Sequence, residues 1–371
     1  MAQTEQLGTV STDSLVEELK RRIAQAEEAK SLLARLANET IQPAKNPKVS
    51  AAKSEYWRRR REWLAANPGK TPEDFHRETR RVLTFDTSAH DRLVKLGESA
   101  NPLYNSIRNQ FFFRLAGSAF EEMVSVLDAA DRLAQLDGCR RLTQNRWWDC
   151  LYPPGEVLRL FIAAHAADPI NFQWRNVDVR SGGLAYELRT GELTADDALA
   201  VLQKSEQYAA QADYRQSWQR VRAALEPIFR QQKLARPKTF AEAYRNHSGS
   251  LLPALGKGLY DAGLRATSAL RGEPATPDTD PSQIQHFLEN CPPFRAMLCG
   301  VMLSWFNTSL KHKSGERFAA GRDDMFMAVY LPLCDLFVTR DRDQHKCFAE
   351  LAQYADVGTE VSYFDEFAAD L

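Results

Sequence analysis

The sequence predicts an α/β protein in which a small open sheet is interrupted by a large helical segment. Short apolar runs at residues 82–86 and 335–339 are typical of buried strands, and an acidic residue lies at or just beyond the end of each. From about residue 141 to residue 320, apolar residues instead recur at helical spacing. The chain therefore divides into strand-bearing parts on either side of a helical part.

The length and composition of the chain exclude several classes of protein. Its 371 residues can bury a substantial core, and a hydrophobic content of 44% argues against wholesale disorder. The formal net charge of −1 excludes a protein that holds nucleic acid by bulk charge alone. The longest strongly apolar run, residues 296–306, is shorter than the ~20 residues that cross a bilayer. The six cysteines have no CxxC pair and no zinc-site spacing, so we expect reduced thiols in a cytoplasmic protein with no membrane partner.

The first element expected along the chain is a helical arm over residues 1–80. Leucine and isoleucine recur at helical spacing between residues 15 and 36, and a second helix is expected from about residue 51. Residues 53–81 hold nine basic and five acidic residues, among them four consecutive arginines at 58–61. Two interpretations stay open: a coiled-coil or docking arm, and a contact with the backbone of a nucleic acid.

The first part of the predicted sheet covers residues 81–142. Its opening strand ends in Asp86, and a polar helix is expected from about residue 88 to residue 97. A second compact apolar run at 111–115 predicts the next strand.

The helix after this second run carries two candidate acids, Glu121 and Glu122. Ser118, followed three residues later by Glu121, predicts a capping box at the start of the helix. A capping role for Glu121 would leave Glu122 pointing elsewhere. We therefore favour Glu122 as the functional acid, and the choice between the two stays open.

The middle of the chain, residues 143–317, is expected to be an all-helical insertion. Its clearest helical periods lie at residues 156–166, 194–211, 214–225 and 294–310. The stretch 272–281, rich in proline, aspartate and threonine, is the best candidate for a surface loop. Most tryptophans of the insertion are expected in its core, but five could also anchor a partner protein or inhibitor: Trp147, Trp148, Trp174, Trp218 and Trp305.

The last part, residues 318–371, returns to alternating helices and strands. A helix is expected to begin at Asp323 or Asp324 and to lead into the strand already noted. A helix over 344–354 and a last strand at 359–363 follow. From residue 320 onward there are eleven acidic and four basic residues, so the neutral total hides an acidic end.

Five acids occupy strand ends or helix starts: Asp86, Glu122, Asp324, Asp341 and Asp343. In an open α/β sheet the C-terminal ends of strands and the N-termini of helices share one edge, so these acids could converge there. Clustered carboxylates repel one another and raise their own pKa values unless a cation neutralises them. Mg²⁺ or Mn²⁺, which prefer oxygen ligands, would do so. Taken singly, Asp86, Asp343, and either Asp323 or Asp324 could instead be helix caps.

Four stretches, which carry all of these acids except the trailing Asp343, together resemble the PIN domain, a family of metal-dependent nucleases that includes bacterial toxin ribonucleases. They are residues 83–88, 118–123, 324–328 and 336–341, and the last, a strand ending in Thr-x-Asp, is the closest match. The resemblance covers roughly 81–142 and 318–371, and the insertion is far larger than a compact PIN domain carries. It implies a three-layer α/β/α core with a central parallel sheet, Mg²⁺ or Mn²⁺ held by the acids, and hydrolysis of phosphodiester bonds, most often in RNA.

We therefore expect a metal-dependent nuclease, in particular an endoribonuclease with a nucleic-acid partner. Asp86, Glu122, Asp324 and Asp341 would be the catalytic metal ligands, with Asp343 in a supporting or second-metal role. The hydroxyl groups of Ser88 and Thr339 would orient ligands or water. The alternatives are an interaction or RNA-binding protein that keeps a PIN-like core without catalysis, and a nuclease directed at DNA.

Overall fold

The computed structural model describes residues 58–70, 75, 79–143, 150–231, 236–273, 278–310 and 322–371. The helical spacing between residues 15 and 36 lies outside these residues, as do Trp147 and Trp148. The chain divides into two compact units, residues 1–72 and 73–371. In the first unit residues 58–66 are helical, within the second helix that the sequence predicts for the arm.

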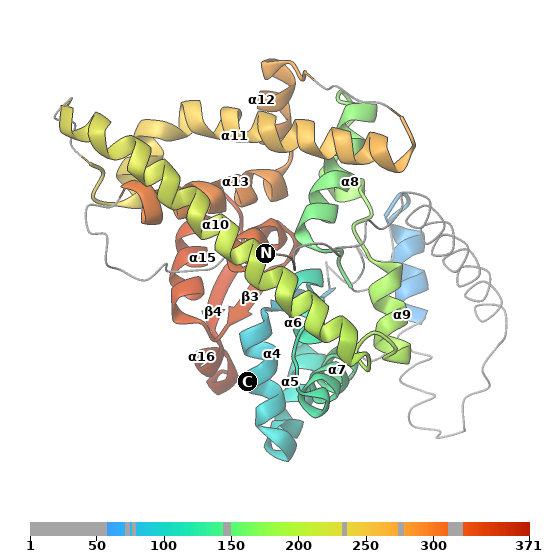
Figure 1. Ribbon diagram of the computed structural model, residues 1–371. Helices are drawn as coiled ribbons and strands as arrows, with labels where there is room; N and C mark the ends of the chain where they lie inside the picture. Colours follow the sequence, from blue (N-terminus) through green and yellow to red (C-terminus); the bar gives the residue numbers. More distant parts are fainter. Residues whose placement is uncertain are drawn as a thin grey trace, which may run out of the picture. The chain divides into compact units, whose positions relative to one another are not determined.

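The second unit is built around a four-stranded sheet (Figure 1). Its strands are β1 (Arg81–Phe85), β2 (Phe111–Phe113), β3 (Leu336–Thr339) and β4 (Glu360–Tyr363). All neighbouring pairs are parallel and the order is β2-β1-β3-β4, with Leu83 of β1 opposite Phe113 on one side and Leu336 on the other. The expected strands are thus all present, in a chain that is mostly helical.

Helices make up most of the rest of this unit (Figure 1). In chain order they are α4 (Thr87–Lys95), α5 (Asn101–Gln110), α6 (Gly117–Val124), α7 (Ala129–Thr143), α8 (Pro154–Ala167), α9 (Gly182–Thr190), α10 (Asp197–Gln231), α11 (Phe240–Leu270), α12 (Pro281–Asn290), α13 (Pro292–Trp305), α14 (Arg322–Phe326), α15 (Arg342–Tyr354) and α16 (Phe364–Ala369). A 3₁₀ segment, η5 (Met327–Leu333), follows α14 directly.

Apolar residues cover both faces of the sheet, because successive strand residues point to opposite sides. Val82, Phe112 and Phe337 belong to one hydrophobic cluster, to which α8, α11, α12, α13 and α15 also contribute. Leu83 and Val338 belong to a second cluster, formed with α4, α5, α7 and α16. Helices from the segment between β2 and β3 therefore complete the core beside the sheet.

One long helix replaces two that the sequence predicts. Separate helices are expected over 194–211 and 214–225, whereas α10 is one unbroken helix from Asp197 to Gln231. Pro227 is the first proline or glycine within α10, so nothing separates the two helical periods. The Asp196 carboxylate caps the start by accepting two backbone N–H bonds at 2.9 and 3.0 Å.

The capping box predicted at Ser118 and Glu121 is wrong. The N-cap of α6 is Ala116, so Ser118 lies inside the first turn, and no side chain caps this helix. The Ser118 N–H is instead 3.3 Å from the hydroxyl of Tyr330, which accepts its hydrogen bond. The preference for Glu122 over Glu121 therefore loses the capping argument that supported it.

The cysteines agree with the expectation of reduced thiols. All six lie in the described part of the chain, are buried and form no disulfide. Burial raises the pKa of the Cys139 thiol far above its usual range, so this group stays protonated. Among the described helices, none has both the length and the apolar character that crossing a membrane requires.

Candidate functional site

The strand order reverses between the two central strands, β1 and β3, although all four strands run parallel. From β1 the chain crosses to β2 on one side, and it later returns to β3 on the other side of β1. Open α/β sheets bind their ligands beyond the carboxyl ends of the strands at such a reversal. Asp86 follows β1 directly and Asp341 lies two residues beyond the end of β3, so both acids stand at this point.

The Asp86 carboxylate is held by donors from both strand ends. The Ser88 hydroxyl donates to it at 2.7 Å, and the hydroxyl of Thr339, the last residue of β3, donates at 2.8 Å. The Ala89 N–H donates to the other oxygen at 2.8 Å, which makes Asp86 the N-cap of α4. With only 4% of its surface exposed, Asp86 is a buried carboxylate in a fixed orientation.

The same two hydroxyl groups connect Asp86 to Asp341. Ser88 Oγ accepts hydrogen bonds from the N–H groups of Arg340 and Asp341 at 2.8 and 3.1 Å. Thr339 Oγ1 accepts a second bond from the Asp341 N–H at 2.9 Å. Because each hydroxyl donates on one side and accepts on the other, the ends of β1 and β3 form one hydrogen-bonded network.

Asp341 is itself the N-cap of α15. Its carboxylate accepts hydrogen bonds from the N–H groups of Asp343 and Gln344 at 2.7 and 2.9 Å. Asp343 lies exposed in the first turn of α15. The capping role considered for Asp86 is thus confirmed, whereas α15 is capped by Asp341 and not by Asp343. Neither cap excludes a further role for the same carboxylate.

Burial dominates the electrostatics of the site, and Asp324, in α14, adds to its effect. The pKa of Asp86 is raised to about 6, chiefly by burial, which outweighs the opposing hydrogen bonds from Ala89, Ser88 and Thr339. The negative charge of Asp324 makes a smaller contribution in the same direction. Burial also raises the pKa of Cys347 to about 12, and several carboxylates add to this effect, among them Asp324 and Asp341. Asp324 therefore lies within electrostatic range of Asp86, and it shares a second neighbour with Asp341.

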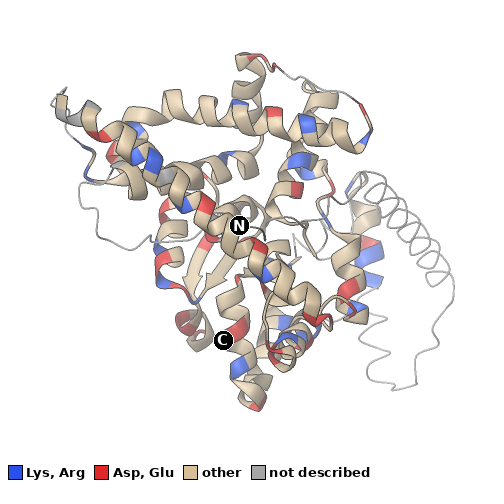
Figure 2. Ribbon diagram, viewed as in Figure 1, with Lys and Arg blue, Asp and Glu red and all other residues tan. Residues whose placement is uncertain are grey.

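Glu122 meets α4 across a cavity of about 420 Å³. The lining residues come from α4, the end of α6, α7 and α10: Thr87, Ser88, Asp91, Glu122, Ser125, Val126, Gln135, Lys204 and Gln207. Lys204 adds a cation to this lining, on a helix where acidic and basic residues are interspersed (Figure 2). A second cavity is lined by both Glu121 and Glu122, so Glu122 is the acid that adjoins both spaces.

A divalent cation requires several oxygen ligands close together, and the carboxylates of the predicted site are the candidates. Within the ranges described, no three His, Cys, Asp or Glu side chains are grouped closely enough to hold a metal, so the four expected ligands do not form one tight cluster. Mg²⁺ commonly takes one or two carboxylates and completes its coordination with water and substrate phosphate. Asp86 and Asp324 both carry carboxylate oxygens, the donor type that Mg²⁺ prefers, and the charge of Asp324 acts on Asp86. In its chemistry this pair fits Mg²⁺ or Mn²⁺.

Two polar groups that line the smaller cavity are not among the site residues that the sequence predicts. Thr87 Oγ1 and Gln135 Oε1 are buried with no hydrogen-bond partner in the described part of the chain, and Gln135 as a whole is 5% exposed. Buried polar groups usually have partners, so such atoms mark places where water or a ligand would bind. Thr87 could have been singled out as the neighbour of Asp86, whereas nothing in the sequence around Gln135 distinguishes it.

No family model, curated protein or solved structure matches this chain.

Proposed function

We propose that this chain is a metal-dependent nuclease with a PIN-like core, and that RNA is its substrate. The proposal depends on one observation: two acids at the ends of adjacent parallel strands share a hydroxyl network where the strand order reverses. Coverage of both sheet faces by apolar clusters is compatible with the α/β/α layering of that family.

The proposed site would hold Mg²⁺ or Mn²⁺ through Asp86 and Asp324. Glu122 and Asp341 would serve as further ligands, and Asp343 would support them or a second ion. A bound divalent cation would supply an activated water and stabilise the charge that develops at phosphorus.

The hydroxyl groups of Ser88 and Thr339 would fix the orientation of the Asp86 carboxylate, and so the position of an ion bound to it. Both donate to the Asp86 carboxylate, and these hydrogen bonds favour its ionised form against the effect of burial. They also fix the backbone that presents Asp341. Lys204, which lines the adjacent cavity, would bind a phosphate group of the strand.

Cleavage assays with single-substitution variants test the proposal. The full chain is incubated with structured and with unstructured RNA in Mn²⁺ or Mg²⁺, beside Asp86→Asn, Asp324→Asn and the control Asp213→Asn. Asp213 is an exposed acid of α10 that lines neither cavity. We expect the first two variants to lose at least about 100-fold in rate while Asp213→Asn keeps full activity.

The outcome that contradicts the proposal is equal cleavage by all four proteins, or none by the wild type with either ion. DNA substrates of the same sequence separate the two nuclease classes. Circular dichroism of each variant shows whether a lost rate reflects a lost fold.

A binding protein without catalysis is the second candidate function. Val201, Leu202 and Tyr208 of α10 are 61%, 55% and 67% exposed, which offers apolar contacts to a partner. Both Asp86 and Asp341 also have complete capping roles that require no metal. RNA binding that survives Asp86→Asn, with no cleavage by the wild type, would favour this candidate.

A further inference from the structure

The smaller cavity, of about 420 Å³, adjoins the Asp86 network and is within the size range of small-molecule sites. Thr87 and Ser88 line it, so it begins at the residue whose hydroxyl donates to the Asp86 carboxylate. Another part of its wall is α10, which crosses α6 (Figure 1) and is joined to it by the Ser125 hydroxyl, which donates to Gln207 Oε1 at 2.9 Å. The helical segment between β2 and β3 thus supplies part of the wall of a space beside the candidate metal site.

Two polar groups of this lining are without a hydrogen bond to any described residue. Gln135, in α7, is 5% exposed, and its Oε1 is buried and unsatisfied. Thr87 Oγ1, at the start of α4, is likewise buried and unsatisfied. The two helices are in contact, because Cys139 Sγ, one turn beyond Gln135, lies 3.8 Å from His90 Nδ1 of α4. An amide oxygen only accepts a hydrogen bond, whereas a threonine hydroxyl can donate one, so a single hydroxyl group of a ligand would satisfy both.

The charge of the lining favours a phosphate beside that hydroxyl. Lys204, in α10, makes no ion pair with any described residue, and its Nζ lies 5.1 Å from the centre of the Tyr208 ring. Asp91, the acid that α4 contributes to the lining, is paired with Lys95 at 2.7 Å. Glu122 also lines the cavity, and the proposed function assigns it to the metal ion. Lys204 is therefore available to a phosphate group.

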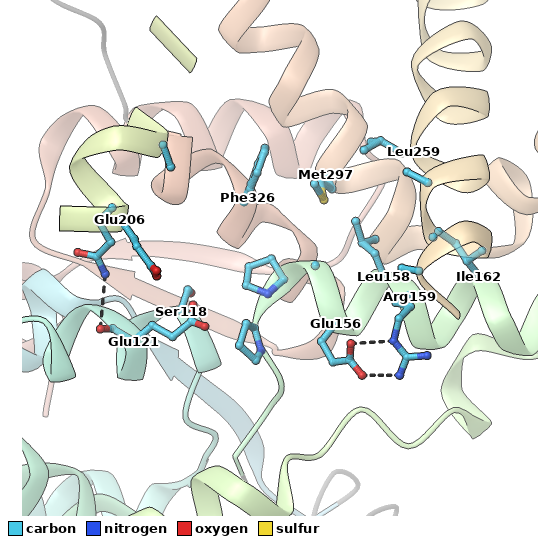
Figure 3. A pocket seen from close by; sticks show the side chains of 18 of the residues that line it. Ser118, Glu121, Glu156, Leu158, Arg159, Ile162, Glu206, Leu259, Met297 and Phe326 are labelled. Atoms are coloured by element: carbon cyan, nitrogen blue, oxygen red, sulfur yellow. Dashed lines mark hydrogen bonds and ion pairs between the residues drawn. The ribbon is translucent and has the colours of Figure 1, made fainter. Parts of the chain in front are cut away.

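The larger cavity, which Glu122 also adjoins, does not offer this combination (Figure 3). Its volume is about 640 Å³, and apolar side chains such as Leu158 and Met297 form much of its wall. Arg159 is the one basic residue of its described lining, and its Nε donates to Glu156 at 2.7 Å (Figure 3). A sugar-phosphate chain is therefore better matched by the smaller cavity.

We propose that the smaller cavity binds a ribonucleotide next to the scissile phosphate and recognises its 2′-hydroxyl group. The inference rests on the proposed function for the identity of the strand. The 2′-hydroxyl would donate to Gln135 Oε1 and accept from Thr87 Oγ1, while Lys204 would pair with a phosphate oxygen. A deoxyribose lacks this hydroxyl, so binding it would leave the Gln135 oxygen buried without a donor. The two side chains would thus select RNA over DNA.

Other occupants satisfy only part of this lining or predict no selection. A phosphodiester group by itself would pair with Lys204, but it has no proton to donate to Gln135 Oε1. An ordered water would satisfy Gln135 and Thr87, and it predicts equal binding of RNA and DNA. The sugar of the strand is therefore the variable that a test must change.

Fluorescence anisotropy of the full chain tests the proposal with two labelled single-stranded hexamers, hexauridylate and its 2′-deoxy counterpart. The two hexamers differ only in their 2′-hydroxyl groups. Titrations are made in Ca²⁺, which takes oxygen ligands, and cleavage of the same hexamers is measured separately in Mn²⁺. We expect the RNA hexamer to bind at least about tenfold more tightly than the DNA hexamer.

Four variants make the test specific. Gln135→Met and Thr87→Val should each weaken RNA binding about five- to tenfold, with DNA affinity unchanged and thermal stability unchanged or higher. Gln203→Met is the matched control, because Gln203 Oε1 is also buried without a described partner but lines the larger cavity. It should keep the wild-type preference for RNA. Lys204→Met should weaken the binding of both hexamers alike.

Equal affinity of the wild type for the two hexamers, including no binding of either, would overturn the proposal. The same preference for RNA in Gln135→Met as in the wild type would also overturn it. Metal-dependent cleavage of both hexamers at equal rates would contradict recognition of the ribose and leave the nuclease proposal standing. A preference for RNA that depends on Gln135, in a protein that cleaves neither hexamer, would support the ribose site and contradict the nuclease.

Discussion

At the residue scale, the Ser88 side chain makes more long-range hydrogen bonds than its position in a short polar stretch suggests. Its hydroxyl donates to the Asp86 carboxylate and accepts from two backbone N–H groups beyond β3, Arg340 and Asp341. These partners are more than 250 residues away in the sequence, so no local pattern predicts the contact. A single hydroxyl thus connects the first and third strands at the candidate site.

Ser88→Ala should lower the free energy of unfolding by about 1–3 kcal/mol, because a buried carboxylate loses one donor and the Arg340 N–H loses its acceptor. Urea denaturation measures the change. The control is Ser99→Ala, which removes one local bond to the Leu96 carbonyl on the surface and should cost less than about 0.5 kcal/mol. Equal costs in the two variants would show that the connection between strands contributes nothing.

His90 should make the fold sensitive to acid. It is 1% exposed, and burial lowers its pKa from 6.5 to about 3. The folded state therefore keeps His90 neutral, whereas the unfolded chain takes up a proton below pH 6.5, so stability falls as the pH drops from 6.5 towards 3. Asp86, whose pKa is raised, acts in the opposite direction between about pH 4 and pH 6.

His90→Phe should remove the histidine contribution and keep the ring contacts with Phe85 and Phe113. Relative to the wild type, the variant should gain about 2–3 kcal/mol in unfolding free energy between pH 7.5 and pH 4.5. Comparing the two proteins at each pH cancels the effect of Asp86. Denaturation midpoints that shift in parallel for both proteins would contradict this prediction.

At the element scale, the start of α6 shows how tertiary contacts override a local signal. The Ser118–Glu121 spacing favours a cap at Ser118, yet the N-cap is Ala116 and the helix begins two residues earlier, at Gly117. A Cβ on Gly117 would lie 2.5 Å from backbone atoms of Tyr152 and Pro153, so only glycine permits this close approach. The chain segment before α8 therefore sets where α6 begins.

Gly117→Ala should destabilise the protein by about 1–3 kcal/mol or more, because backbone atoms cannot move aside as a flexible side chain can. Gly155→Ala is the matched control: this glycine lies in the first turn of α8, and an added Cβ would meet nothing within 4 Å. We expect that control to be neutral or slightly stabilising, since alanine favours a helix. Thermal and urea unfolding measure both, and a stable Gly117→Ala variant would contradict the close approach.

The elements that the sequence predicts well are those whose signal is local. Strands β1 and β3 are short apolar runs buried on both faces, and these runs are enough to identify them from the sequence. The buried Oε1 of Gln135, which has no hydrogen-bond partner among the described residues, could not be predicted in the same way. Its importance arises from a cavity lined by α4, α6, α7 and α10, and no local pattern records such an arrangement.

At the scale of the whole molecule, the helical segment between β2 and β3 is part of the core beside the sheet. The cluster on one face of the sheet joins Val82, Phe112 and Phe337 to residues of α8, α11, α12 and α13. Trp174 and Trp305, two candidate partner anchors, pack partly buried against this same cluster. An insertion that completes a core in this way should unfold together with the sheet.

Two truncated chains test this cooperativity. A chain in which residues 150–310 are replaced by a short Gly/Ser linker should fail to fold cooperatively, because one face of the sheet would lose its apolar cover. A chain of residues 73–371 keeps the whole compact unit and should unfold in one urea transition with a midpoint close to that of the full chain. Circular dichroism and binding of an apolar dye measure both. A single sharp transition in the first chain would mean that the sheet and its remaining helices suffice, and that the helical segment is an independent domain.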